Sequence, residues 1–209
     1  ITTRQYPEDV WNSAENYLLG HDFQRAERML NEYLEVETRH RRARALSGLG
    51  EALVSLNRLD EAIAAVNDCI EFHEKDPSAY RARLLCSSSY TELGEFDKAQ
   101  KLLLDNLYHE SLTPKSLEWR DSLFALGRLL HYEASLMQTK SRVASIDDSA
   151  SSIKSHIKEL EKSQPIVQDA ITRLTEAVAR YPEAEQAVES RYLIAESHRL
   201  AATLPQTKL

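Results

Sequence analysis

Seven histidines are among the residues of this chain that could hold a metal ion or transfer a proton. They are scattered along the sequence, at His21, His40, His73, His109, His131, His156 and His198. No pair shows the His-Glu-x-x-His spacing that places two imidazoles on one helix face to bind zinc. We therefore interpret them as surface or packing residues, and only His131 is expected to face a binding groove.

Cys69 and Cys86 are the only cysteines of the chain. They are too few for a disulfide framework, and their spacing from other Cys or His residues does not suit zinc. Each takes a small or apolar position of the repeat described below, so we interpret both as core thiols between neighbouring units. A disulfide between them is the alternative.

Three other patterns that could support chemistry are incomplete. The stretch Gly48-Leu49-Gly50 lacks the third glycine and the preceding strand of a nucleotide-binding loop. Asp147 and Asp148 lack the alternating acids, central glycine and closing Glu of a calcium loop, so we expect them to start or cap a helix. No serine lies in a Gly-x-Ser-x-Gly turn. The sequence predicts no catalytic, metal-binding or cofactor-binding residue, no cofactor, and no enzyme.

Composition and charge narrow the class of protein. Of 209 residues, 42% are hydrophobic and 28% charged, as in an ordinary globular chain, and the few Gly and Pro favour helix. The net charge of −7 argues against a nucleic-acid partner. No apolar run approaches the ~20 residues of a membrane span. The basic stretch 39–44, RHRRAR, is interpreted as a solvated helix start, with an acidic partner as the alternative.

An internal repeat predicts the elements that position these residues. Ala26, Ala62 and Ala99 serve as anchors, and the same residue types recur around each. Before each anchor there is a small residue at a distance of twelve positions (Ala14, Gly50, Ser87) and a large residue at a distance of nine (Tyr17, Leu53, Tyr90). After each anchor there are apolar residues at a distance of four positions (Leu30, Val66, Leu103) and of eight (Leu34, Ile70, Leu107). Spacings of three and four place residues on one helix face. Each unit is therefore predicted to be two helices joined by a tight turn.

The stretch 93–103, LGEFDKAQKLL, shows how one unit turns. Gly94 is predicted to end the first helix, because glycine tolerates the backbone of a tight turn. Phe96 would fill the turn, and Ala99 would be small because another helix lies on it. One such pair cannot bury its apolar face alone, so several pairs must stack into an all-α solenoid.

These units resemble tetratricopeptide repeats, whose signature is a small residue, an aromatic, a Gly at the turn, then Ala, a large apolar residue, a second Ala and a closing Pro. The later matches are a second helix with Ala170, Leu174, Ala177 and Pro182, its first helix with Leu126, Gly127 and Leu130, and a fifth first helix with Ile194, Ala195 and His198. The resemblance implies a right-handed α-α superhelix that binds proteins without catalysis.

We predict a single repeat domain over residues 1–209. Its repeats span about 7–36, 43–77, 80–110 and 116–182, with a partial repeat at 184–203. The fourth contains an insertion at about 136–164, in which SRVASIDDSASS is expected to be a loop. A short amphipathic helix would follow and end before Pro165, which would open the next helix. We interpret the insertion as a simple extension of the two helices of this repeat, with an added docking element as the alternative.

In tetratricopeptide arrays the first helices line a concave groove, and their outward residues contact the partner. The resemblance implies these protein-binding residues: Glu15, Arg44, Ser47, Glu51, Arg81, Leu84, Ser88, Arg128, His131 and Glu196. The family's clamp for a carboxylate terminus is absent, because its cation places hold Trp11, Ser47, Leu84 and Phe124 and its Asn places hold Glu15, Glu51, Ser88 and Arg128. The mixed charge favours an extended or helical protein segment. Arg81 and Arg128 are expected to point inward near His131 and to meet an acidic or C-terminal stretch of the partner.

The resulting hypothesis is a non-enzymatic scaffold with a protein or peptide partner. The alternative is a regulatory or docking domain of a larger enzyme or sensor whose active domain lies outside this sequence. The stretch 179–201 resembles the Tyr-Pro, Ala, Tyr-x-x-Ala-Glu pattern of bacterial envelope tetratricopeptide proteins, such as outer-membrane assembly lipoproteins and TolA-binding proteins. That likeness implies the periplasmic side of a cell envelope, with a cytoplasmic location as the alternative. Because the chain begins at Ile1, we expect a fragment of a longer protein.

Overall fold

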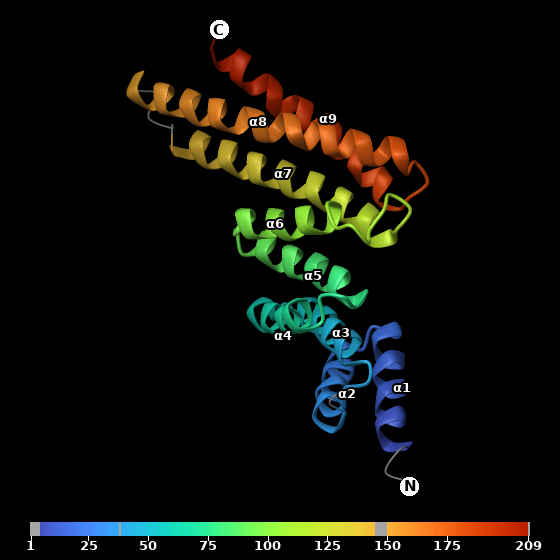
Figure 1. The fold of residues 1–209 in the computed structure, drawn as a ribbon. Coiled ribbons are helices and arrows are strands. Elements are labelled where there is room, and N and C mark those ends of the chain that lie inside the picture. Colours follow the sequence, from blue (N-terminus) through green and yellow to red (C-terminus); the bar gives the residue numbers. More distant parts are fainter. Residues whose placement is uncertain (1–4, 38, 145–149, 209) are drawn as a thin grey trace. The chain divides into compact units, whose positions relative to one another are not determined.

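The computed structural model describes residues 5–37, 39–144 and 150–208, and the chain divides into two compact units, Ile1–Leu102 and Leu103–Leu209. Unit 1 holds α1 (Gln5–Leu19), α2 (Phe23–Val36), α3 (Arg42–Ser55), α4 (Leu59–Phe72) and α5 (Ser78–Glu92). The division falls within α6 (Phe96–Leu107), and unit 2 holds α7 (Leu117–Ala144), α8 (Ala150–Arg180) and α9 (Gln186–Thr207) (Figure 1). The all-α prediction is confirmed, whereas the single domain over 1–209 stays a prediction.

The anchor alanines lie where the repeat pattern places them. Ala26, Ala62 and Ala99 are all buried, and so are Leu30 and Val66, four residues after the first two anchors. In unit 1, α1 packs on α2 and α3 packs on α4, which makes the first two predicted repeats helix pairs. The small and apolar spacing of the sequence therefore marks real helix-helix contacts.

Two glycines show how closely the paired helices approach. A Cβ atom added to Gly50 on α3 would lie 2.1 Å from Cγ1 of Val66 on α4. A Cβ added to Gly127 on α7 would lie 2.7 Å from Cδ2 of Leu174 on α8. Because Val66 and Leu174 both lie four residues after an anchor alanine, the same contact recurs in both units. Helices α7 and α8 therefore pack as a pair in unit 2, although Gly127 and Leu174 are far apart in the sequence.

The turn between paired helices uses one backbone conformation three times. His21, Asn57 and Gly94 have φ values of 56°, 58° and 76°, and each lies five residues before an anchor. The next residue of each turn donates its backbone N–H to a carbonyl five residues earlier, as Glu95 does to Tyr90 at 2.8 Å. The predicted role of Gly94 is confirmed. His21 and Asn57 take the same left-handed turn at a cost of roughly 1–2 kcal/mol each.

The fourth repeat differs in part from the sequence prediction. Helix α8 runs without a break for 31 residues and contains Pro165, so the short helix that was expected to end before Pro165 is wrong. The interpretation of the insertion as two extended helices is confirmed, and Figure 1 shows α7 and α8 lying alongside each other. The centre of the expected loop, 145–149 with Asp147 and Asp148, lies outside the described residues, while its flanks are helical.

Packing on both sides holds α8 together across its proline. Pro165 is exposed, whereas Leu160 and Val167 on either side of it are buried. The amide of Gln138 on α7 donates to Ser163 Oγ at 3.0 Å and to the backbone carbonyl of Leu200 on α9 at 3.3 Å. Three helices are thus joined within a turn of Pro165. These contacts offset the cost of about 3 kcal/mol for a proline inside a helix.

Candidate functional site

Two ion pairs connect the first helices of unit 1. Arg44 on α3 lies 2.5 Å from the carboxylate of Glu15 on α1, and Arg81 on α5 lies 2.7 Å from that of Glu51 on α3. Each glutamate directly follows the small residue of its own repeat, and each arginine comes six residues before the small residue of its own repeat. We call these four residues the unit 1 ion-pair row. The row joins each first helix to the next one at a repeated position.

Unit 2 has the same pair with opposite charges. Arg128 directly follows the small residue Gly127 on α7, and it lies 3.3 Å from Glu189 on α9. Glu189 comes six residues before Ala195, which is the spacing of Arg44 from Gly50. Glu189 was not among the predicted site residues, although this spacing could have found it. The predicted site residue Arg128 is therefore already paired within unit 2.

The basic stretch 39–44 is partly used inside unit 1. Helix α3 begins at Arg42, as the helix-start interpretation expected. Arg41 lies 2.8 Å from Glu8, and its guanidinium stands 5.5 Å from the ring centre of the buried Trp11. The guanidinium of Arg44 stands 5.2 Å from the same ring. Two cations of the stretch therefore stabilise the contact of α1 with α3.

The remaining predicted residues of unit 1 differ in accessibility. Ser88 on α5 is exposed, Leu84 is half-buried, and Ser47 on α3 is buried. Within the described part of the chain, Ser47 Oγ has no hydrogen-bond partner. The Ser47 hydroxyl thus lies below the surface, and burying it without a hydrogen bond lowers the free energy of unfolding by about 1–3 kcal/mol.

His131 in unit 2 acts as a contact between α7 and α9. It is half-buried, and its Nδ1 lies 2.8 Å from Oγ of the buried Ser197. Burial lowers the pKa of His131, with the carboxylate of Glu196 opposing this effect and the Arg199 cation adding to it. The predicted site residue Glu196 is itself paired with Arg199 at 2.8 Å. At neutral pH the imidazole is therefore uncharged and adds no cation beside Arg128.

The cysteines show the features of packing residues. Cys69 and Cys86 are buried free thiols, and burial raises the pKa of both to about 12. The thiolate is the nucleophilic form, so at neutral pH neither cysteine is activated. Their interpretation as core thiols is confirmed. Across residues 5–37, 39–144 and 150–208, no three or more His, Cys, Asp or Glu side chains gather where a metal could bind, and no helix has the length and apolar character of a membrane span.

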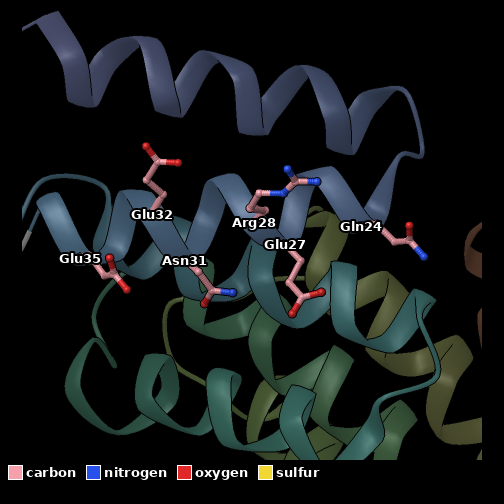
Figure 2. Close-up of a pocket in the computed structure, with 6 residues that line it drawn as sticks. All are labelled: Gln24, Glu27, Arg28, Asn31, Glu32 and Glu35. Carbon is pink, nitrogen blue, oxygen red and sulfur yellow. The ribbon is translucent and has the colours of Figure 1, made fainter.

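A polar hollow on α2 was not predicted. Figure 2 shows the six side chains that line it, all from one helix: Gln24, Glu27, Arg28, Asn31, Glu32 and Glu35. Glu27 lies 2.6 Å from Arg58, and Tyr6 donates a hydrogen bond to Glu32. The recurrence of polar residues at helical spacing could have indicated this face. Two of its three acids already serve contacts within unit 1, and the side chains that line it are all polar.

Comparison with known proteins identifies the fold. No family model matches the sequence, and no curated protein matches it. Among solved structures, the chain is similar to a tetratricopeptide repeat protein from Parabacteroides merdae, with a TM-score of 0.51 and 19% identity over 95% of this chain and 77% of that one. It is also similar to a MamA RS-1 ArsTM double mutant, with a TM-score of 0.51 and 14% identity over 92% of this chain and 94% of the other. Together with the internal repeat, these likenesses show that the chain has the tetratricopeptide repeat fold.

Proposed function

We propose that the chain is a non-enzymatic scaffold that binds an acidic, extended or helical segment of a partner protein along α1, α3 and α5 of unit 1. The observation that carries this proposal is the unit 1 ion-pair row. Its arginines come from two successive first helices, so one bound segment can contact several repeats at once. Binding of protein segments by stacked helical repeats is the general use of such extended surfaces.

The ion pairs of the row are weak enough for the carboxylates of a partner to replace those of the glutamates. Arg44 and Arg81 are exposed, and exposed ion pairs contribute only about 0–1 kcal/mol. A partner carboxylate that loses its water in the complex gains roughly 1.5–3 kcal/mol from a charge-assisted hydrogen bond. An acidic segment can therefore compete for these arginines at little cost to the scaffold.

The chemistry of α5 suggests how the segment is held. Arg81, Leu84 and Ser88 recur at three- and four-residue spacing and so share a face of this helix. A cation, a half-buried apolar side chain and a hydroxyl together match a segment that alternates an acid with an apolar residue. Arg128 and His131 belong to unit 2, so a groove that they share with Arg81 stays a prediction.

The test has two steps: a partner protein is first captured with this chain, and its affinity for variants of the chain is then measured. The immobilised chain would be cross-linked to proteins of its source organism, and the partner identified by mass spectrometry and purified. We expect Arg81→Glu to raise its Kd at least tenfold, which corresponds to about 1.4 kcal/mol. The matched control is Arg25→Glu, which removes an exposed arginine that pairs with Asp22 at 3.2 Å at the start of α2. Equal effects of both variants, or no effect of either, would refute the proposed surface.

A location in a bacterial cell envelope is part of the proposal only through the likeness of residues 179–201 to envelope proteins of this fold. Fractionation of cells that express the native protein tests it, and recovery in the cytoplasm alone would reject it. The alternative function, a docking domain of a larger enzyme or sensor, is tested by sequencing the native gene. A catalytic or DNA-binding domain beside this one would favour that alternative.

A further inference from the structure

Helices α3 and α5 each present one exposed arginine at the same repeat position. Both helices contain two arginines and one glutamate, and α3 packs directly on α5. Arg42 is half-buried and donates to the backbone carbonyl of Leu34 at 3.1 Å, while Arg83 is buried. Arg44 and Arg81 are therefore the exposed arginines of these two helices.

The second helix between them in the chain carries the opposite charge. Helix α4 contains four exposed acids and no basic residue: Asp60, Glu61, Asp68 and Glu71. Arg58 directly before it pairs with Glu61 at 2.5 Å, which leaves the helix with a net negative charge. An acidic segment is repelled from α4 and attracted to the arginines of α3 and α5. Charge therefore directs such a segment to the unit 1 ion-pair row.

The separation of the two arginines sets the spacing of the carboxylates that they can bind together. Arg44 and Arg81 occupy the same position of successive first helices, and packed helices lie roughly 8–10 Å apart. A polyproline II segment has three residues per turn and rises about 3.1 Å per residue. Every third side chain of such a segment therefore points the same way, at intervals of roughly 9 Å. Acids at every third position match the row.

Two other backbone conformations fit the row less well. In a β-strand, residues three apart point to opposite faces, and residues two or four apart are separated by about 7 or 13 Å. In an α-helix, residues seven apart share a face at about 10.5 Å, but a bound helix lays its apolar side into an apolar groove. Leu84 is the one apolar residue among those predicted for this surface in unit 1, and it is half-buried. A helix would thus place its apolar side on charged and hydroxyl groups.

The glutamates of the row leave donors of both arginines available. Arg81 contacts Glu51 through Nη2 at 2.7 Å, and Arg44 contacts Glu15 through Nη2 at 2.5 Å. A guanidinium has five N–H donors, so a partner carboxylate can bind the same arginine from the solvent side. The negative charge of the glutamate still opposes the incoming carboxylate. Glu15 and Glu51 therefore weaken the binding of an acidic segment without preventing it.

We propose that the unit 1 ion-pair row binds a polyproline II segment that carries an acid at every third position, and that Glu15 and Glu51 limit its affinity. This inference rests on the function proposed above, and it names the backbone conformation of the partner segment and the spacing of its acids. The segment crosses α3 and α5, with one carboxylate on Arg44 and the next on Arg81.

Two synthetic peptides of equal composition test the spacing. One repeats Glu-Pro-Ser, and the other repeats Glu-Glu-Pro-Ser-Pro-Ser, in which no two acids are three residues apart. Proline favours polyproline II in both, so the peptides differ in the spacing of their charges. A third peptide, an alanine-rich helix with acids seven residues apart, represents a helical partner. Titrations of the whole chain, followed by amide NMR at low salt, give the affinities, because exposed charges are least screened there.

We expect the Glu-Pro-Ser peptide to bind about fivefold or more tightly than the other two. Arg44→Gln and Arg81→Gln should each remove this preference, because a single arginine cannot distinguish spacings. Glu51→Gln should tighten binding by roughly two- to fivefold, since the exposed pair that it removes is weak. Glu95→Gln is the matched control, because it removes the same charge from an exposed glutamate that pairs with Lys98. Circular dichroism melts show that each variant is folded.

Several results would overturn the proposal. These are no saturable binding of the Glu-Pro-Ser peptide, equal binding of the two proline peptides, and tighter binding of the helical peptide. A preference that survives in Arg81→Gln would also overturn it, because the spacing would then be recognised elsewhere. An affinity that Glu51→Gln leaves unchanged, or that Glu95→Gln raises equally, would reject the limiting role of the glutamates.

Failure of this inference is distinguishable from failure of the proposed function. The proposed function is decided by the effect of Arg81→Glu on the captured partner. If that variant weakens the partner while the two proline peptides bind equally, the binding surface stands and the polyproline II assignment is wrong. If Arg81→Glu leaves the partner's affinity unchanged, the surface itself is wrong, and the inference fails with it.

Discussion

The unit 1 ion-pair row and the Arg128–Glu189 pair of unit 2 occupy the same repeat positions with opposite charges. In unit 1 the arginines are the more exposed partners, at 65% and 58% of their side chains against 31% and 33% for the glutamates. In unit 2 the glutamate is the more exposed partner, at 55% against 44% for Arg128. Unit 1 therefore presents cations to solvent at this position, and unit 2 presents an anion.

This difference shows which property the repeat preserves. The position of the contact between successive first helices is set by helix geometry, and either charge order satisfies it. The sign that a partner meets depends on which member of the pair lies nearer to solvent. Arg81 and Arg128 are thus not equivalent, although the sequence suggested a common acidic partner for both.

The largest expected effect concerns a difference between the second helices of the two units. Helix α8 contains Pro165, whereas α2 and α4 of unit 1 contain no proline inside them. Pro165→Ala should restore a backbone hydrogen bond to residue 161 and raise the free energy of unfolding by up to about 3 kcal/mol. Urea unfolding monitored by circular dichroism measures this gain. A loss of stability would mean that α8 depends on a kink at Pro165.

A second comparison concerns the close contact that both units share. Gly50→Ala and Gly127→Ala should each lower the free energy of unfolding by about 1–3 kcal/mol, because the new methyl group overlaps Val66 or Leu174. Val66→Ala should reduce the overlap with the new methyl group. Gly50→Ala should therefore cost less free energy of unfolding in a Val66→Ala background than in the unchanged chain. If Gly50→Ala instead stabilises the protein, helix propensity outweighs the overlap and the two helices are farther apart than described.

A third prediction exchanges the charge order of one unit. The double variant Glu51→Arg with Arg81→Glu keeps the ion pair and the net charge but gives unit 1 the order of unit 2. Stability should change by less than about 0.5 kcal/mol, while the Kd of an acidic partner should rise about tenfold. Thermal melts and partner titrations measure the two quantities. Unchanged binding would show that charge order does not matter to the partner.

The smallest expected effect is a pH dependence confined to unit 2. Because burial lowers the pKa of His131, the unfolded chain binds a proton at this residue more readily than the folded chain. Stability should therefore fall as the pH drops below the ordinary histidine pKa of about 6.5, and His131→Gln should reduce this slope. Urea unfolding at several pH values between about 5 and 8 tests it. An unchanged slope in His131→Gln would assign the pH dependence to other groups.

The turns show where sequence reasoning succeeded and where it stopped. Gly94 was predicted to turn the chain because glycine tolerates the backbone of a tight turn, and it does so with a φ of 76°. His21 and Asn57 adopt the same conformation without being glycine, so residue type alone did not mark them. Their place five residues before an anchor was the available signal. In these turns the repeat position is a better guide to the backbone than the preference of the single residue.

Pro165 shows the opposite limit. A proline is a local signal to end a helix, and the sequence prediction followed that signal. The structure carries α8 past it because Val167 is buried beyond it and Gln138 bonds to Ser163 just before it. A local preference worth about 3 kcal/mol was outweighed by packing against two neighbouring helices.

By itself, the sequence determined the helix pairs, the anchor alanines and the burial of both cysteines. These features follow from a periodic pattern of small and apolar residues, which helix geometry converts directly into a packing face. The tertiary structure alone decided that Arg81 pairs with Glu51 and that Ser47 is buried. The reason is that a contact between successive repeats depends on how the helices stack, and residue spacing within one helix does not specify the neighbour it meets.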